Sequence, residues 1–486
     1  MRRLLASSIA ASVGVACATA LALPPAPPAA AATARPAASR DGSGPAAVRH
    51  DPPGSTRSLP LHPLGPGARD RAVGSPAAGE LGLTRRDVRH FSMVGVVWDD
   101  PGTELHGRVQ VRTRAAGSGV WSGWRNLETH NDDAADPGTP ERGSGRVHGA
   151  TAPLWVGDSD GVEVRIRAEA APRTAPRTAT PAPGTRAAPP ASALPSGLRL
   201  ELVDPGGKAE GEGGAQAAPY AAPAGVPRPG ALGAGAAEER AASAANAGLA
   251  PLGATEIPAL SRTATERELQ TLGGGEPAAG QRAKPYIGPR PRIITRHGWG
   301  ANERLREKGF VYTRKVKVAF VHHTSSGNGY RCSQAASVIR GIYRYHVTSM
   351  GWRDLGYNFL VDKCGNIYEG RAGGVAKAVL GAHTLGFNTD SMGVAVIGSF
   401  GSHRPPAAAL RAVSRLTAWK LGLYGANPRG RTYLKSGGGN LYRKGKKVRL
   451  HVISGHRDGY ATACPGTQLY RRLGTARTTA ARYQGR

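Results

Sequence analysis

The stretch KVKVAFVHHTSS, residues 315–326, decides the fold class of the C-terminal part of the chain. Its apolar residues first alternate with lysine and then run continuously to a pair of histidines, His322 and His323. A short apolar run of this kind is typical of a buried strand. The histidine pair therefore places polar chemistry at the exit of a buried strand.

Helix and strand patterns alternate on the C-terminal side of this stretch. Apolar residues at helical spacing predict helices over residues 332–350, 405–425 and 467–484. Shorter apolar runs predict strands within residues 357–371, 391–400 and 448–458. Interleaved strands and helices indicate a mixed α/β domain, and we assign it to residues 285–486.

The rest of the chain divides by composition. Residues 1–32 combine a positively charged start, an alanine-rich apolar run and small residues suited to cleavage, which predicts a secretory signal peptide. Residues 33–85 are rich in proline and alanine and predict a disordered leader. Residues 86–204 alternate apolar and polar residues between turn residues, which predicts a small antiparallel β domain, arranged as a sandwich. Residues 205–284, rich in alanine, glycine and proline, predict a flexible linker.

The formal net charge of +30 favours a polyanionic partner. Together with the signal peptide it predicts a secreted, cell-wall-associated protein, with anionic wall polymers as partners of the basic segment 442–450. No nucleic-acid motif is recognisable, so no nucleic-acid partner is expected. No later stretch approaches the roughly 20 apolar residues of a membrane span, so no stable anchor is expected. Retention of the signal, or acylation of Cys17, would instead give membrane attachment. We expect a monomer.

The cysteine count singles out Cys464. Signal cleavage leaves Cys332, Cys364 and Cys464, and an odd number in a secreted protein leaves one without a partner in the same chain. Cys464 follows His456 by eight residues in GHRDGYATACPG, residues 455–466. On the residues alone it is open to three interpretations: half of a disulfide, a nucleophile with His456 as its base, or a metal ligand. Two imidazoles and a thiolate are good zinc ligands, and three protein ligands leave a fourth position for water.

Five segments, in order along the chain, carry a resemblance to a known family: RHGWGA, VAFVHHTS, YHVTSMGWRDLGYNFLVDKCGNIYEGR, GAHTLGFNTDSMGVAVIGSF and GHRDGYATACPG. Residues 293–473 resemble the peptidoglycan recognition protein and type 2 amidase family. The resemblance implies a central mixed sheet flanked by helices. It also implies zinc-dependent hydrolysis of the peptidoglycan amide that joins N-acetylmuramic acid to L-alanine.

Carried over residue by residue, the resemblance implies roles for individual side chains. The zinc ligands are His322, His456 and Cys464, with Zn²⁺ as the cofactor. Tyr357 matches the family's active-site tyrosine. Thr462 stands where some members have a lysine, and it is expected to support the oxyanion. This difference leaves the general base unassigned.

Further residues are expected around the ligands. His323 is expected to pack or hydrogen-bond beside them. The other residues assigned to the substrate groove are His346, Trp352, His383 and Asn388. Glu369 is expected to serve the fold and not the reaction. A disulfide between Cys332 and Cys364 is expected from secretion and from the cysteine count.

The function predicted for the chain is therefore a zinc-dependent N-acetylmuramoyl-L-alanine amidase that binds peptidoglycan and cleaves it. One alternative is a recognition module that binds peptidoglycan without cutting it, although such relatives typically lack the cysteine ligand. The other alternative is a cysteine hydrolase that uses Cys464 as its nucleophile, but it gives His322 no role.

Overall fold

The computed structural model describes residues 54–64, 80–129, 133–169, 194–207, 234–272 and 285–486. All of these residues fall within one compact unit, residues 51–486. The predicted signal peptide lies outside the described residues, as does most of the predicted leader. Among the residues that are described, no helix is both long and apolar enough to cross a membrane.

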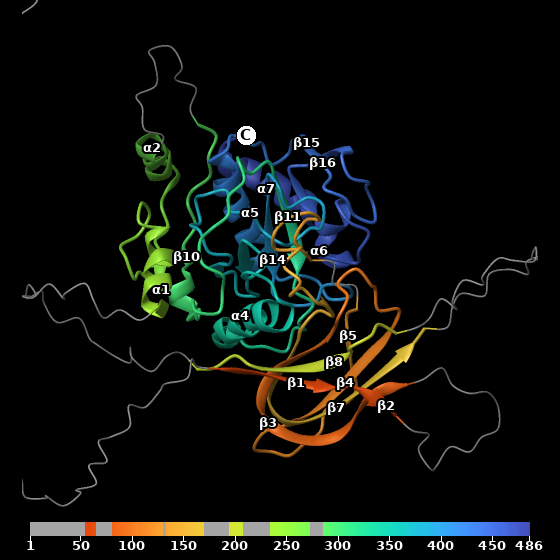
Figure 1. The fold of residues 1–486 in the computed structure, drawn as a ribbon. Helices are drawn as coiled ribbons and strands as arrows, with labels where there is room; N and C mark the ends of the chain where they lie inside the picture. Colours follow the sequence, from red (N-terminus) through yellow and green to blue (C-terminus); the bar gives the residue numbers. More distant parts are fainter. Residues whose placement is uncertain (1–53, 65–79, 130–132, 170–193, 208–233, 273–284) are drawn as a thin grey trace, which may run out of the picture. The chain divides into compact units, whose positions relative to one another are not determined.

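Eight strands form the N-terminal sheet (Figure 1): β1 (Ser55–Pro60), β2 (His62–Pro63), β3 (Leu81–Trp98), β4 (Gly107–Ala115), β5 (Arg125–Leu127), β6 (Gly149–Ala150), β7 (Leu154–Ala168) and β8 (Arg199–Asp204). The strand order is β1-β8-β3-β7-β4-β5, with β2 and β6 also paired to β3, and all pairs are antiparallel. The predicted β-rich domain is confirmed. Its strands form one continuous hydrogen-bonded sheet, in which register shifts bend the long strand β3, and the sandwich arrangement stays a prediction.

The first strand corrects the N-terminal boundary. β1 lies within residues 33–85, which were expected to be disordered, and it pairs with β8 from Ser55 opposite Asp204 to Pro60 opposite Arg199. Of its six residues only Leu59 is buried. An edge strand with one buried side chain shows no period-two hydrophobic pattern, so composition alone suggested a leader.

The C-terminal sheet contains β9 (Glu256–Ile257), β10 (Ile293–Ile294), β11 (Val318–His323), β12 (Phe359–Val361), β13 (Ile367–Glu369), β14 (Ser391–Val396) and β17 (Ile453–Gly455). Its order is β17-β11-β14-β12-β13-β10-β9. The first four strands in this order are parallel, and β13 is antiparallel to β12. A separate hairpin consists of β15 (Arg431–Lys435) and β16 (Lys447–His451). The predicted mixed sheet is confirmed.

Helices cover both faces of this sheet (Figure 1). The C-terminal domain contains α3 (Arg296–Trp299), α4 (Ala335–Arg344), α5 (Ala407–Gly422), α6 (Thr467–Tyr470) and α7 (Leu473–Gln484). Strand residues Phe359, Val361 and Val394 pack in one hydrophobic cluster with α5 and α7. Their neighbours Leu360 and Ala395 pack on the opposite face with α4. This alternation is the period of two that a strand requires when both of its faces are buried.

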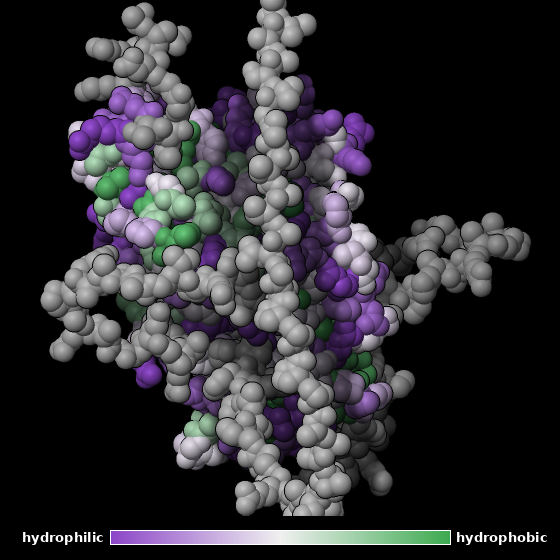
Figure 2. Space-filling model, turned by 60° about the vertical axis from the view of Figure 1, so that its left-hand side comes forward, coloured by the Kyte–Doolittle hydropathy of each residue, from purple (hydrophilic) through white to green (hydrophobic). Residues whose placement is uncertain are grey.

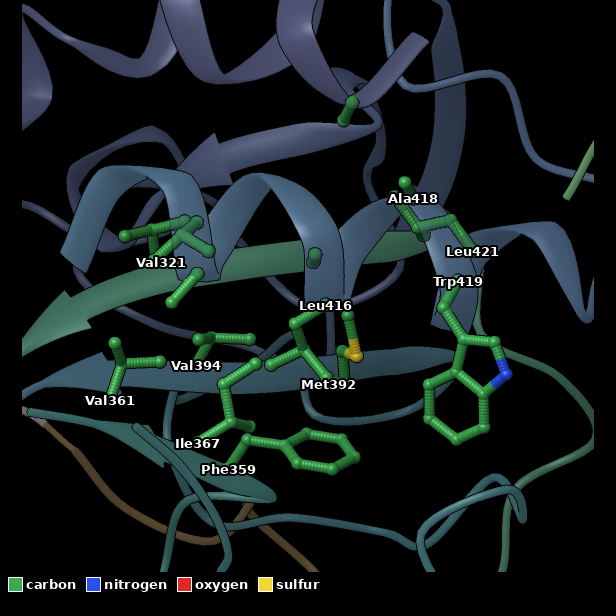
Figure 3. Packing of buried hydrophobic residues seen from close by; sticks show 14 of the residues in the cluster. Val321, Phe359, Val361, Ile367, Met392, Val394, Leu416, Ala418, Trp419 and Leu421 are labelled. Carbon is green, nitrogen blue, oxygen red and sulfur yellow. The ribbon is translucent and has the colours of Figure 1, made fainter. Parts of the chain in front are cut away.

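Figure 3 shows how the first of these clusters is built. The side chains of Val361, Val394 and Met392 point from the sheet toward Leu416 of α5, and Trp419 closes one end of the cluster. All of these side chains are buried, with Leu416 and Trp419 fully so. Burial of this kind fixes the sheet against α5 and so holds the ends of its strands in place.

The segment expected to be a linker contributes to the C-terminal domain. It contains α1 (Ala234–Ala244), α2 (Arg262–Leu272) and β9, and β9 pairs with β10 at the sheet edge. Asn246, just after α1, donates a 2.9 Å hydrogen bond to Glu369 of β13. The prediction of a flexible linker over residues 205–284 is therefore wrong for these elements. Helix α1 is alanine-rich and α2 is mostly polar, so the composition resembled that of a linker.

The two sheets share a hydrophobic core. Met93 and Trp155 of the N-terminal sheet belong to the same buried cluster as Ile339 and Ile342 of α4. The hydroxyl of Tyr345, which follows α4, donates to the carbonyl oxygen of Thr151 at 3.1 Å. The β domain is thus packed on α4 through both apolar and polar contacts.

The face of the molecule that Figure 2 shows is mostly polar in its described part. On the face that Figure 2 shows, hydrophilic residues cover most of the described part, and hydrophobic residues gather mainly in a small group at the upper left. This distribution agrees with the strongly basic composition of the chain.

The predicted disulfide is confirmed. Cys332 and Cys364 are bonded, with their Cα atoms 6.2 Å apart and a sequence separation of 32. The bond joins the turn before α4 to the turn between β12 and β13. In the chain-entropy model a loop of this length contributes roughly 3–4 kcal/mol to the free energy of unfolding.

Replacing both bonded cysteines, Cys332→Ser with Cys364→Ser, is therefore expected to lower the free energy of unfolding by about 3–4 kcal/mol. Denaturant unfolding followed by circular dichroism measures the change. Wild-type protein unfolded under a reducing agent is the control, and it is expected to match the double variant. Equal unfolding midpoints for the variant and the oxidised wild type would contradict the assigned contribution.

Candidate functional site

Three ligand-type side chains meet at one edge of the C-terminal sheet. His322 is the penultimate residue of β11, and His456 follows β17 directly. Because β11 and β17 are adjacent and parallel, with Val321 opposite Gly455, both imidazoles leave the sheet at the same edge. The loop after His456 returns Cys464 to them, so that one ligand atom from each residue lies within 4.8 Å of the others.

The strand itself selects His322 over His323. Val318 and Phe320 of β11 pack beneath the β15-β16 hairpin, whereas Ala319 and Val321 face α5 and α7. By this alternation His322 projects with Phe320, toward His456 and Cys464. His323 takes the other direction, and its Nδ1 accepts a 3.1 Å hydrogen bond from the amide of Phe400. His323 thus hydrogen-bonds beside the cluster, and its assignment to the substrate groove stays a prediction.

The cluster is buried and its imidazoles are neutral. His322, His456 and Cys464 expose 0%, 1% and 7% of their surface. Burial lowers the pKa of both histidines to about 3 and raises the pKa of the Cys464 thiol. The Nε2 atom of His322 lies 3.4 Å from the hydroxyl of Thr384. Donation along that contact leaves Nδ1, which lies 3.7 Å from Cys464 Sγ, with its lone pair facing the cluster.

The donor set fits a zinc ion. Neither ring nitrogen of His456 has a hydrogen-bond partner among the described residues, and both are buried. Buried polar atoms without partners are costly, and a bound cation would satisfy them. Two neutral imidazoles and a thiolate match the ligand preference of Zn²⁺. Within the part of the chain that is described, this is the one group of three such residues.

The sequence analysis missed one residue at this site, Asp133, which belongs to the N-terminal domain. Its Oδ1 lies 3.0 Å from His322 Nδ1 and 3.4 Å from His456 Nδ1. Its Oδ2 accepts a hydrogen bond from the hydroxyl of Tyr357 at 2.5 Å. Burial raises the pKa of Asp133 to about 6. The available signal was an acidic run, DDAAD at residues 132–136, in a strongly basic chain.

The two residues expected to be catalytic lie beside the cluster. The ring of Tyr357 is buried, with its centroid 5.5 Å from that of His322. Thr462 is half-buried, and its hydroxyl accepts a 3.2 Å hydrogen bond from the amide of Cys464. Thr462 thus shapes the loop that presents the thiol. A catalytic role for either residue stays a prediction.

The residues assigned to the substrate groove are all buried in this structure. His383 packs 5.3 Å from His322, measured between ring centroids, and His346 packs 4.5 Å from Trp352. The side-chain amide of Asn388 donates to Ala134 and Asp136 of the N-terminal domain. The structure brings His383 to the cluster, but none of the five assigned residues, His323 included, is open to a ligand.

Glu369 forms its hydrogen bonds with residues outside this cluster. Its two carboxylate oxygens accept hydrogen bonds from Asn246 and from the backbone amide of Arg296. These bonds tie α1 and α3 to β13, which agrees with the structural role expected for Glu369.

Two family sequence models match the chain. The family described as N-acetylmuramoyl-L-alanine amidase matches residues 312–467, which include the whole cluster. A second family, described as Rv3811 N-terminal galactose-binding domain-like, matches residues 39–186. The fold and the cluster thus define an amidase-type domain preceded by a β domain.

The similar proteins found by sequence and by structure are peptidoglycan recognition proteins. Peptidoglycan recognition protein 1 of Bos indicus is 34% identical over 188 residues, which cover 37% of this chain and 80% of that protein. Peptidoglycan-recognition protein SC2 of Drosophila melanogaster is 28% identical over 186 residues, 38% of this chain and 85% of that protein. The solved structure of Drosophila PGRP-LB has 25% identity and a TM-score of 0.30, and covers 38% of this chain and 93% of that one. The chain belongs to the peptidoglycan recognition protein and amidase family.

The alternation along β11 gives a matched pair of variants. His322→Ala is expected to weaken zinc binding by more than about 100-fold, because changes to residues that merely support ligands already cost 10–100-fold. His323→Ala removes an adjacent imidazole that points away from the cluster, and it is expected to leave zinc affinity within about threefold of wild type. Zinc competition against a chromophoric chelator measures both, with thermal melts to verify folding. Equal losses in the two variants would contradict the assignment.

Proposed function

We propose that the C-terminal domain is a zinc-dependent N-acetylmuramoyl-L-alanine amidase that hydrolyses peptidoglycan. The observation that carries the proposal is the buried cluster of His322, His456 and Cys464 with Tyr357 beside it, inside the region that matches the amidase family. The names of the relatives support peptidoglycan as the ligand. The basic charge and the signal-like start of the chain support export to the cell wall.

Each side chain has a defined task in this proposal. The chemistry that bound zinc supplies is Lewis acidity, which polarises a carbonyl and makes water nucleophilic near neutral pH. His322 would hold the ion through Nδ1, His456 through a ring nitrogen, and Cys464 through Sγ. The hydroxyl of Thr384 orients His322 by bonding its other ring nitrogen, which fixes the ligating lone pair.

Tyr357 would act at the scissile carbonyl. Burial raises the pKa of its phenol well above the ordinary value, so the phenol keeps its proton at neutral pH. A retained O–H donates to the carbonyl oxygen as negative charge develops there, which lowers the barrier to attack. Thr462 would keep the Cys464 loop in shape through its bond to the Cys464 amide.

The geometry favours a metal ligand over a nucleophile at Cys464. A nucleophilic cysteine needs a lowered pKa and a neighbouring base. Burial instead raises the pKa of Cys464, and its side-chain neighbour is His322 Nδ1 at 3.7 Å rather than a ring nitrogen of His456.

Incubation of the purified full-length chain with peptidoglycan tests the proposal. We expect new L-alanine amino groups to appear on the stem peptides, to disappear when zinc is chelated, and to return when zinc is added back. Amino-group labelling followed by mass spectrometry of the released peptides measures this. Release that is undiminished by chelation would exclude the zinc mechanism.

Cys464→Ser separates cleavage from recognition. The variant is expected to lose zinc and cleave at least about 100-fold more slowly, because a first ligand is lost. Sedimentation with insoluble peptidoglycan is expected to be unchanged, since the rest of the domain is intact. Cleavage at the wild-type rate would remove Cys464 from the mechanism, and absence of cleavage by wild type together with retained sedimentation would favour a recognition module.

A further inference from the structure

Asp133 occupies a position that the proposed reaction does not use. Its carboxylate is 4% exposed, and Oδ1 has no hydrogen-bond partner among the described residues. That oxygen faces Nδ1 of both His322 and His456. When a carboxylate oxygen and an imidazole nitrogen are buried face to face, a proton or a cation must lie between them.

Three distances among Asp133 and the cluster match those between ligands of one ion. In a tetrahedral zinc site, two nitrogen or oxygen ligands stand roughly 3.3 Å apart, and a nitrogen and a sulfur roughly 3.6 Å apart. Asp133 Oδ1 is 3.0 Å and 3.4 Å from the two histidine nitrogens, and His322 Nδ1 is 3.7 Å from Cys464 Sγ. We propose that Asp133 is a fourth protein ligand of the metal, contributed by the N-terminal domain, and that it closes the site to substrate. This inference rests on the proposed zinc site.

The same carboxylate also forms a hydrogen bond with the hydroxyl of Tyr357. Oδ2 accepts the phenol's proton in a 2.5 Å hydrogen bond, so the donor assigned to the substrate carbonyl is already engaged. A catalytic zinc site keeps three protein ligands and one open position, whereas a site with four protein ligands is closed. Asp133 thus takes both the fourth position on the metal and the hydrogen bond of the Tyr357 phenol, and the scissile amide needs both.

The segment that follows Asp133 is anchored to the C-terminal domain. Asp136 Oδ1 accepts hydrogen bonds from the amide of Gly386 at 2.8 Å and from the side chain of Asn388 at 2.7 Å. Glu141 forms a two-point ion pair with Arg371, at 2.8 and 2.9 Å. Both partners of that pair are buried, with side chains 6% and 4% exposed. Paired buried charges of this kind define one position for the segment.

Access to the cluster therefore depends on the N-terminal domain. Tyr357 and Cys464 are 3% and 7% exposed, and residues 133–136 are buried against them and their neighbours. A bulky glycan-peptide reaches the metal only when Asp133 withdraws. A site that is open for about one hundredth of the time cleaves about one hundredth as fast as a permanently open one. The chain is accordingly a latent form of the enzyme.

Full-length Asp133→Ala tests the assignment, with Asp87→Ala as the matched control. Asp87 lies on β3 of the same domain, and its side chain is 83% exposed. We expect Asp133→Ala to bind zinc at least about tenfold more weakly, because one ligand is lost. We also expect the visible spectrum of its cobalt-substituted form to change and to respond to added thiocyanate, which enters the vacated position. Asp87→Ala is expected to match wild type in both measurements.

The rate of peptidoglycan cleavage provides the second readout. Opening the site is expected to raise the initial rate of Asp133→Ala at least about tenfold over wild type. Asp133→Asn preserves the shape of the side chain but ligates poorly, so it is expected to show the same changes if the alanine variant folds badly. Unchanged affinity and spectrum in both variants would overturn the fourth ligand. A lower cleavage rate in both would overturn the closure and make Asp133 a required base.

The zinc content of wild type separates this inference from the proposed function. If the wild type binds no zinc, both the proposed zinc amidase and the fourth ligand are contradicted. Wild type that binds one zinc tightly through His322 and Cys464, but is indifferent to Asp133, would remove only the fourth ligand.

Discussion

The hydrogen bonding of β11 between β14 and β17 is the constraint on which the site depends. The parallel pairing brings the carboxyl ends of these strands to one edge, with Val321 opposite Gly455. His322 and His456 follow these paired residues directly, so the register alone sets their separation. A slip of one residue would move β11 by about 3.3 Å and turn His322 to the opposite face. The packing of α5 and α7 on the sheet keeps that register.

Around this edge, three acidic groups of the N-terminal domain lie where they have partners. The chain carries a net charge of +30, yet the carboxylates of Asp133, Asp136 and Glu141 are all buried at the C-terminal domain. Each accepts hydrogen bonds: from the hydroxyl of Tyr357, from the amides around Asn388, and from the guanidinium of Arg371. Burial of a charge is tolerable only with such partners. These contacts are therefore specific, and they tie the N-terminal domain to the functional edge of the sheet.

Sequence reasoning reached the parts of the structure that local patterns encode. The apolar run before His322 and the cysteine count depend on neighbours along the chain or on simple arithmetic, and they predicted the strand and the disulfide. The full ligand set of His322, His456 and Cys464 was implied by the resemblance of five segments to the family. Asp133 could not be found this way, since it is separated from His322 by 189 positions and meets it only through tertiary packing. β1 and α1 were missed for another reason. They bury few large side chains, so their sequences contain few large apolar residues and resemble the sequence of a linker.

The shared core between β3 and α4 has a consequence for modularity. Two separate families match this chain, over residues 39–186 and 312–467, as though it were assembled from independent parts. Yet Met93 and Trp155 fill the same buried cluster as Ile339 and Ile342. Separating the parts would expose that apolar surface to water on both sides, at about 25 cal/mol for each Å² uncovered. The folding unit is thus larger than either family, and the two have become mutually obligate in this chain.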